Sequence, residues 1–217
     1  MRTRSRVIAT ISTASVLAAV LAARSAGATA AGQGQERAAI VAFDECIQER
    51  FKDVDEGFGF TRIARIGTPH RFNAENASEI TAVRELERSR MRVVLYLTGR
   101  QVLGPRPPAS EGPAVFSRII KGPALVTPRE ADPSAPAPAD LWDDGRRAML
   151  AFAKTNLYEF SSGRWKFTAR PVRATATMCL NCHAADGTIH MAPNGSPVDS
   201  ALRVGDPLGV VMYGYRQ

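Results

Sequence analysis

The chain has 217 residues, of which 45% are hydrophobic and 23% charged, as in ordinary globular proteins that bury one core. The formal net charge of +7 includes four arginines in the first 30 residues, which hold no Asp or Glu, so without that segment the charge is +3. The other basic residues are scattered and lack an interleaved aromatic platform, so we expect no binding to nucleic acid.

The N-terminus has the pattern of an export signal. Three arginines precede an apolar run over residues 7–23, and small residues in Ala-x-Ala spacing follow. The run is rich in Ala, Ser and Thr and is shorter than the ~20 residues that a membrane span needs. A cleaved signal peptide over residues 1–30 is therefore favoured over an uncleaved anchor. We expect one domain over residues 31–217, exported to the periplasm, with no membrane span after cleavage.

Hydrophobic periodicity and β-propensity predict the elements in chain order: a helix over 36–54, a short strand or loop over 57–67, a helix over 76–91, a strand over 92–97, a helix over 139–156, and strands over 164–174 and 209–216. Asn76 or Ser78 can cap the second helix, and Asp140 the third. Residues 99–139 are rich in Pro and Gly, which indicates an insertion or loop region with a strand or two, most mobile over 128–138. The mixture without a βαβ rhythm predicts an α+β domain with an antiparallel sheet.

The clearest motif is Cys-x-x-Cys-His at Cys179, Cys182 and His183. In a c-type haem site, two thioethers tether the porphyrin and the adjacent histidine ligates the iron. Two residues between the cysteines place both sulfurs on one turn of chain, and the histidine follows at once on the same side. The motif therefore favours one covalently bound haem c, and attachment after export agrees with the signal segment.

Two other interpretations of the motif stay open. A disulfide or a thioredoxin-like dithiol would not need the histidine, and Asp186-Gly187 soon interrupts the helix that a dithiol motif opens. A structural zinc site needs four ligands, but Cys46, His70 and His190 do not form a second pair with matching spacing. Export favours disulfides, yet three cysteines cannot all pair within one chain.

The second ligand of the iron is not decided by spacing. The candidates are residues with sulfur or imidazole side chains: Cys46, His70, Met178, His190, Met191 and Met212. Three of them lie very close in sequence to the motif, which makes it awkward for them to reach the opposite face. The others are the kinds of residue that are more often simply on the surface or in the core.

Three blocks of sequence carry a resemblance. They are ERAAIVAFDECIQERF, then RIARIGTPHRFNAENASEITAVRELE over residues 62–87, then FTARPVRATATMCLNCHAADG with the closing RVGDPLGVVMYGYR. In this order they resemble a family of single-haem c-type domains with a PAS-like fold, found as soluble cytochromes in cyanobacteria and as haem-bearing sensor domains in other bacteria. In the second block the matching positions are Arg65, Thr68, Arg71, Asn73 and Asn76.

The resemblance implies a PAS-like antiparallel sheet with flanking helices and an N-terminal helix that packs on the haem. It also implies that the thiolate of Cys46 is the second axial ligand opposite His183, which would stabilise the ferric iron and give a low reduction potential. Arg65, Arg71 and Arg170 are candidates for contacts with the haem propionates, together with Arg173.

These features lead to an expected function as an exported monohaem c-type cytochrome that acts in redox or small-ligand sensing. The alternative is a simple periplasmic electron carrier whose haem is permanently six-coordinate. The expected partner is a redox protein or a small gas ligand, and the sequence does not indicate an oligomeric state. No constellation of catalytic acids, bases or nucleophiles stands out, so we do not expect an enzyme.

Overall fold

The computed structural model describes residues 34–52, 59–65, 67, 69–128, 130–189, 199 and 201–216. The contacts divide the chain into two compact units, Met1–Ala38 and Ala39–Gln217. Of the first unit, the structure describes only residues 34–38, so the predicted signal peptide lies outside the described residues. Thr68, His190 and Met191 also lie outside them. All strands of the described residues belong to the second unit.

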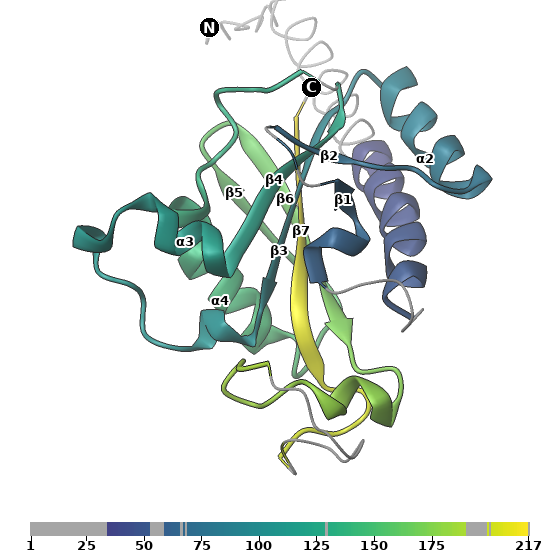
Figure 1. The fold of residues 1–217 in the computed structure, drawn as a ribbon. Helices are drawn as coiled ribbons and strands as arrows, with labels where there is room; N and C mark the ends of the chain where they lie inside the picture. The colour runs from purple at the N-terminus through teal and green to yellow at the C-terminus, as the bar shows by residue number, and fades with distance from the viewer. Residues whose placement is uncertain are drawn as a thin grey trace, which may run out of the picture. The chain divides into compact units, whose positions relative to one another are not determined.

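One sheet runs through this unit, in the strand order β1-β2-β4-β3-β7-β6-β5 (Figure 1). The strands of the described residues are β1 (Ala64–Arg65), β2 (His70–Phe72), β3 (Arg92–Gly99), β4 (Ile120–Thr127), β5 (Tyr158–Ser162), β6 (Trp165–Arg173) and β7 (Pro207–Arg216). The predicted α+β class is confirmed, as are the strands predicted at 92–97, 164–174 and 209–216. The prediction of a purely antiparallel sheet is wrong for one pair, because β2 and β4 are parallel. Parallel neighbours need a long crossover, and here two helices and β3 separate the two strands in the sequence.

Three of the described helices lie close to their predicted positions, and one was not predicted. A helix over residues 34–52, called here the N-terminal helix, is followed by α2 (Ala77–Arg88), α3 (Pro113–Ile119) and α4 (Trp142–Ala151). Asn76 caps α2 as predicted, since its side chain accepts from the backbone N–H of Glu79. The prediction that Asp140 caps α4 is wrong. Its carboxylate accepts from the N–H of Ala137 and closes the 3-10 turn η4 (Pro138–Leu141) just before the helix begins.

The Pro- and Gly-rich region 99–139 is part of the folded unit. It contains the predicted strand as β4, but the apolar segment before it forms helix α3, where Pro113 starts the first turn. The segment expected to be most mobile, 128–138, is anchored at several points. The Trp165 Nε1–H donates to the carbonyl of Ser134 over 2.8 Å, and the hydroxyl of Tyr96 donates to the carbonyl of Pro136 over 2.7 Å.

A helical layer covers each face of the sheet (Figure 1). On one face the N-terminal helix and α2 bury apolar side chains against alternate residues of β3 and β7, such as Leu95 and Val211. On the other face α3 and α4 pack over the intervening residues, such as Tyr96 and Met212. Strand β5, which periodicity did not predict, pairs with β6 through a two-residue turn that starts at Gly163 with φ +58°.

Candidate functional site

The Cys-x-x-Cys-His motif lies in the connection from β6 to β7. Its first part forms the 3-10 turn η5 (Thr177–Asn181), and the backbone of His183 forms an isolated bridge with Ile189. Leu180, between the two cysteines, is buried in a small apolar cluster with Leu202 and Leu208. The apolar residue of the motif therefore packs the turn against the start of β7.

The loop that follows the motif is fastened to the 3-10 turn η2 (Arg100–Leu103). Arg100 donates to the carbonyls of Ala185 and Pro207 over 2.8 and 2.9 Å. Gly187 has φ +89°, and a Cβ placed there would lie 2.2 Å from the backbone nitrogen of Gln101. Only glycine fits this close approach, so the Asp-Gly turn noted in the sequence has a packing role.

A cavity of about 500 Å³, within the size range of small-molecule sites, opens beside the motif. It is lined by residues far apart in the sequence: Phe51, Gly59, Arg62, Leu97, Val172, Arg173, Met178, Cys179, Asn181, Cys182, His183, Ile189, Leu208 and Gly209. Of the sheet residues among them, Leu97 and Val172 pack in the cluster under the N-terminal helix, whereas Arg173, Leu208 and Gly209 lie where β6 stops and β7 begins. Both cysteines and the histidine of the motif thus border one largely apolar space.

The ionisable groups of the motif have shifted pKa values. Burial and the positive charge of Arg62 lower the pKa of His183, which keeps its imidazole neutral at neutral pH, the form that binds metals. Burial opposes ionisation of Cys179, but hydrogen bonds from the backbone at Ala176 and Thr175 outweigh it and lower the pKa of the thiol. Cys46, Cys179 and Cys182 are all described residues, and none of them forms a disulfide.

The chemistry of these side chains suits a c-type haem on one side of the cavity. The site offers two thiols for thioether bonds and a neutral imidazole for the iron, and aliphatic side chains line the space of about 500 Å³ beside them. Two guanidinium groups, those of Arg62 and Arg173, supply the positive charge that haem carboxylates require. These residues therefore fit the group that the motif predicts.

The two arginines differ in their existing contacts. Arg173 donates to the carbonyls of Gly205 and Phe152 over 2.7 and 2.8 Å and to Asn156, so it ties the end of β6 to its surroundings. Nη1 of Arg62 donates to the carbonyl of Phe51 over 3.3 Å, at the end of the N-terminal helix. The sequence reasoning did not single out Arg62. Its only signal was a place at the start of the second resembling block.

The three arginines named first for propionate contacts do not line this cavity. Arg65 and Arg71 are exposed and face each other across β1 and β2, where charged side chains protect a sheet edge from pairing with other chains. Arg170 donates from Nε to the carboxylate of Asp44 over 2.7 Å. The structure therefore brings Arg173 to the cavity, but not the other three.

Cys46 is also not among the residues that line the cavity. Its thiol donates to the carbonyl of Ala42 within the N-terminal helix and lies near Ser78 and Glu79 at the start of α2. Burial raises the pKa of this thiol. The residue that the N-terminal helix contributes to the cavity is Phe51.

The other candidates for the second axial ligand are spread over the fold. Met178 lines the cavity and is 58% exposed, whereas Met212 is buried on the opposite face of the sheet. His70 accepts from the backbone N–H of Gly67 and packs edge-on against Phe60. Of the candidates that the structure describes, only Met178 borders the cavity.

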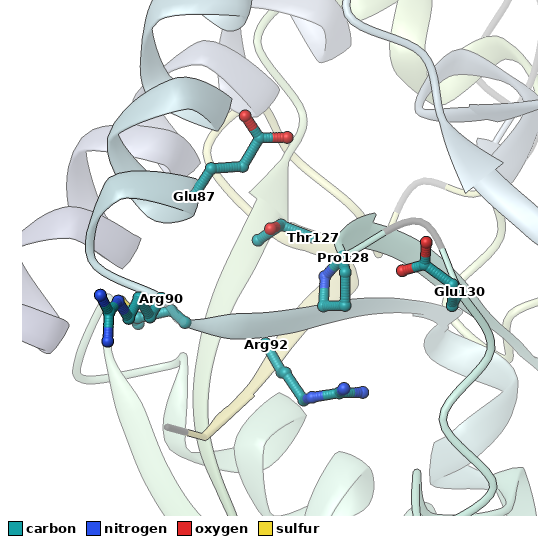
Figure 2. Close-up of a pocket in the computed structure, with 7 residues that line it drawn as sticks. Glu87, Arg90, Arg92, Thr127, Pro128 and Glu130 are labelled. Atoms are coloured by element: carbon teal, nitrogen blue, oxygen red, sulfur yellow. The ribbon is translucent and has the colours of Figure 1, made fainter.

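A second hollow of about 550 Å³ lies elsewhere, at the end of α2. It is lined by Glu87, Arg90, Met91, Arg92, Thr127, Pro128 and Glu130. Figure 2 shows that its charged groups do not converge: Glu87 and Glu130 lie on opposite sides of Pro128, and Arg92 points away from both. Arg92 also pairs with Asp132. This hollow offers no common point at which a ligand would be held.

Membrane-spanning helices and metal-binding clusters are both absent from the described residues. None of the helices in this part of the chain is long and apolar enough to cross a membrane. Within the same residues, three or more His, Cys, Asp or Glu side chains do not gather into a metal-binding cluster.

Comparisons of the chain with family models, with curated proteins and with solved structures found no match.

Proposed function

We propose that this chain is an exported c-type cytochrome domain with a PAS-like fold that carries one covalent haem c. The observation that carries the proposal is that Cys179, Cys182 and His183 border a single apolar cavity of about 500 Å³. Residues that are close in a motif do not always line the same cavity. The cavity that these three share therefore supports the haem site that their spacing predicts. The signal segment over residues 1–30 supports export to the periplasm.

The sheet supports the PAS-like part of the proposal. Its five longest strands lie in the order β4-β3-β7-β6-β5, and each pair of neighbours is antiparallel. Of these five, β3 comes first in the sequence and β7 last, and the two pair with each other at the centre. Helices cover both faces, and the N-terminal helix packs on the face that holds the cavity. This arrangement agrees with the antiparallel sheet and flanking helices that the resemblance implies.

Haem c, when bound, supplies an iron centre that exchanges one electron and takes axial ligands. The thiols of Cys179 and Cys182 would hold it covalently, and His183 would provide the proximal ligand. Aliphatic side chains such as Leu97 and Val172 give the cavity an apolar wall. The positive charge of Arg62 near His183 favours the uptake of an electron at this position.

A haemochrome measurement tests the proposal. The full chain would be expressed with the cytochrome c maturation machinery, and its pyridine haemochrome spectrum recorded after extraction with acidified acetone. We expect one covalent haem per chain in the natural sequence and loss of covalent attachment in the Cys179→Ala, Cys182→Ala double variant. Cys46→Ala is the matched control, since it removes a cysteine outside the cavity and should keep the covalent haem. Absence of covalent haem from the natural chain would overturn the proposal.

Cys46 as the second axial ligand is a separate part of the proposal, and it rests on the resemblance. Its contacts with the region of Ser78 and Glu79 do not add support. Electron paramagnetic resonance of the ferric protein decides the matter. A thiolate ligand predicts a spectrum that changes in Cys46→Ala and is retained in Met178→Ala. An unchanged spectrum in Cys46→Ala would rule out thiolate ligation.

The proposed role is redox or small-ligand sensing, and the alternative is electron transfer with a permanently six-coordinate iron. The expected partners are a small gas ligand in the first case and a redox protein in the second. The apolar cavity with exposed Met178 and Ile189 at its wall is compatible with both. Rapid binding of CO to the ferrous protein would support sensing, whereas an inert six-coordinate spectrum would support electron transfer.

A further inference from the structure

A residue that lines the cavity holds a buried polar atom without a hydrogen bond. Oδ1 of Asn181 is buried and has no partner among the described residues. Asn181 is the last residue of η5 and lines the cavity together with His183, two positions further along the chain. Because a buried acceptor without a donor is costly, such a group in a native structure calls for an explanation, and a donor that arrives with function is one.

The available donors at this cavity are few. The guanidinium of Arg173 is already bonded to Gly205, Phe152 and Asn156. That of Arg62 donates from Nη1 to the carbonyls of Arg50 and Phe51. The two cysteine thiols would lose their protons to thioether bonds under the proposed function. The ring of His183 has no hydrogen-bond partner among the described residues, so it has an N–H to offer. An acceptor and a donor on the same turn of chain therefore both lack partners.

Ligation changes what the histidine needs. When one ring nitrogen binds a metal, the other carries the proton and nearly always donates it to an oxygen acceptor, which fixes the ring and makes the imidazole a stronger donor to the metal. In this cavity the other lining side chains are mainly aliphatic, aromatic or sulfur-containing, or are guanidinium groups that only donate. The carbonyl oxygen of Asn181 is the side-chain acceptor that the cavity provides.

We propose that Asn181 is a positioning residue for His183, and that its Oδ1 accepts the hydrogen bond from the free ring N–H of the ligating imidazole. This inference rests on the proposed function and adds a residue to the site within the motif itself, at a position where the Cys-x-x-Cys-His pattern allows any side chain. By accepting that hydrogen bond, Asn181 strengthens the imidazole as a ligand and favours the ferric state.

The test uses the haem-loaded full chain and three variants. Asn181→Leu removes the acceptor at similar size, Asn181→Asp keeps an acceptor, and Thr177→Val is the matched control because Thr177 is an exposed polar residue of the same turn. Two quantities are measured: the rate at which the His183 ring N–H exchanges with deuterium, followed by nuclear magnetic resonance, and the reduction potential.

We expect faster exchange and a higher potential in Asn181→Leu, retained protection and a lower potential in Asn181→Asp, and no change in Thr177→Val. Equal exchange rates in Asn181→Leu and the natural chain would overturn the inference. So would rapid exchange in Asn181→Asp, which decides the matter even where the leucine variant does not fold. Absence of covalent haem from the natural chain is a different result, because it overturns the proposed function before either variant is compared.

Discussion

Arg170 on β6 donates from Nε to Oδ2 of Asp44 over 2.7 Å and so joins two segments that lie 126 residues apart. The side chain of Asp44 is only 1% exposed, and its other oxygen accepts from the hydroxyl of Tyr213 on β7 over 2.5 Å. One buried carboxylate thus fastens the N-terminal helix to two strands. The same helix carries Phe51 in its last turn, in the wall of the cavity, so this contact also sets the position of that wall.

Removing the guanidinium should therefore destabilise the protein strongly. Arg170→Ala leaves the Asp44 carboxylate buried without its cationic partner, with neutral donors from Tyr213 and Gln48, and breaking a buried pair in this way costs about 3–5 kcal/mol. Urea unfolding at neutral pH measures the change in the free energy of unfolding. Arg88→Ala is the control, since Arg88 forms an exposed pair with Glu85 and should cost less than about 1 kcal/mol. Equal losses in the two variants would show that the Asp44 contact is not a buried pair in solution.

Glu79 should make the stability depend on acid pH. Burial raises the pKa of this carboxyl, but hydrogen bonds from Arg50, over 2.6 Å, and from the N–H of Glu75, over 2.7 Å, outweigh burial and lower the pKa. The unfolded chain therefore takes up the proton first as the pH falls. The stability that Glu79 contributes is present above its unfolded pKa of about 4.3 and is lost as the pH drops towards its folded value.

The measurement is urea unfolding between pH 7 and pH 3. We expect Glu79→Gln to be less stable at pH 7 and to lose less stability than the natural chain on acidification. If the two proteins lose stability in parallel over this range, Glu79 is not one of the groups that titrate on unfolding.

Gly187 should tolerate no side chain. Alanine there requires a left-handed backbone at φ +89° and a Cβ 2.2 Å from the nitrogen of Gln101, so the loop after the motif must leave its place against η2. We expect Gly187→Ala to lose at least about 2 kcal/mol of stability. Gly163→Ala is the control, since its φ is +58° but its Cβ would meet open space, and it should lose only about 1 kcal/mol. Thermal unfolding compares the two, and a smaller loss at Gly187 would contradict the close packing of the loop.

Gly145 is the opposite case, in which alanine should stabilise the protein. The residue lies inside α4, and a Cβ there would make ordinary contacts of 3.6 Å with Val102, 3.7 Å with Thr98 and 3.8 Å with Met212. Alanine is favoured over glycine in a helix interior by about 1 kcal/mol. We expect Gly145→Ala to raise the free energy of unfolding by about 0.5–1 kcal/mol in urea titrations. A decrease would mean that α4 packs closer to the sheet than the structure shows.

Local patterns predicted the local elements well. Apolar spacing in the N-terminal helix and in α2 is a property of neighbouring residues, and the Asn76 cap acts over three residues, so both could be read without the fold. The same holds for β3, β6 and β7, which carry continuous or alternating apolar residues. Helix α3 and strand β5 were missed, because short segments of mixed composition take their form from the surfaces they pack against.

The prediction for the motif likewise comes from the sequence alone, because the spacing of Cys179, Cys182 and His183 is local. Which other side chains meet the motif was decided only by the tertiary structure. The cavity includes Arg62 and Phe51 rather than Arg65, Arg71, Arg170 or Cys46. Whether a residue faces the cavity depends on the rotation of its helix and the register of its strand, and both are set by long-range contacts such as Asp44 with Arg170.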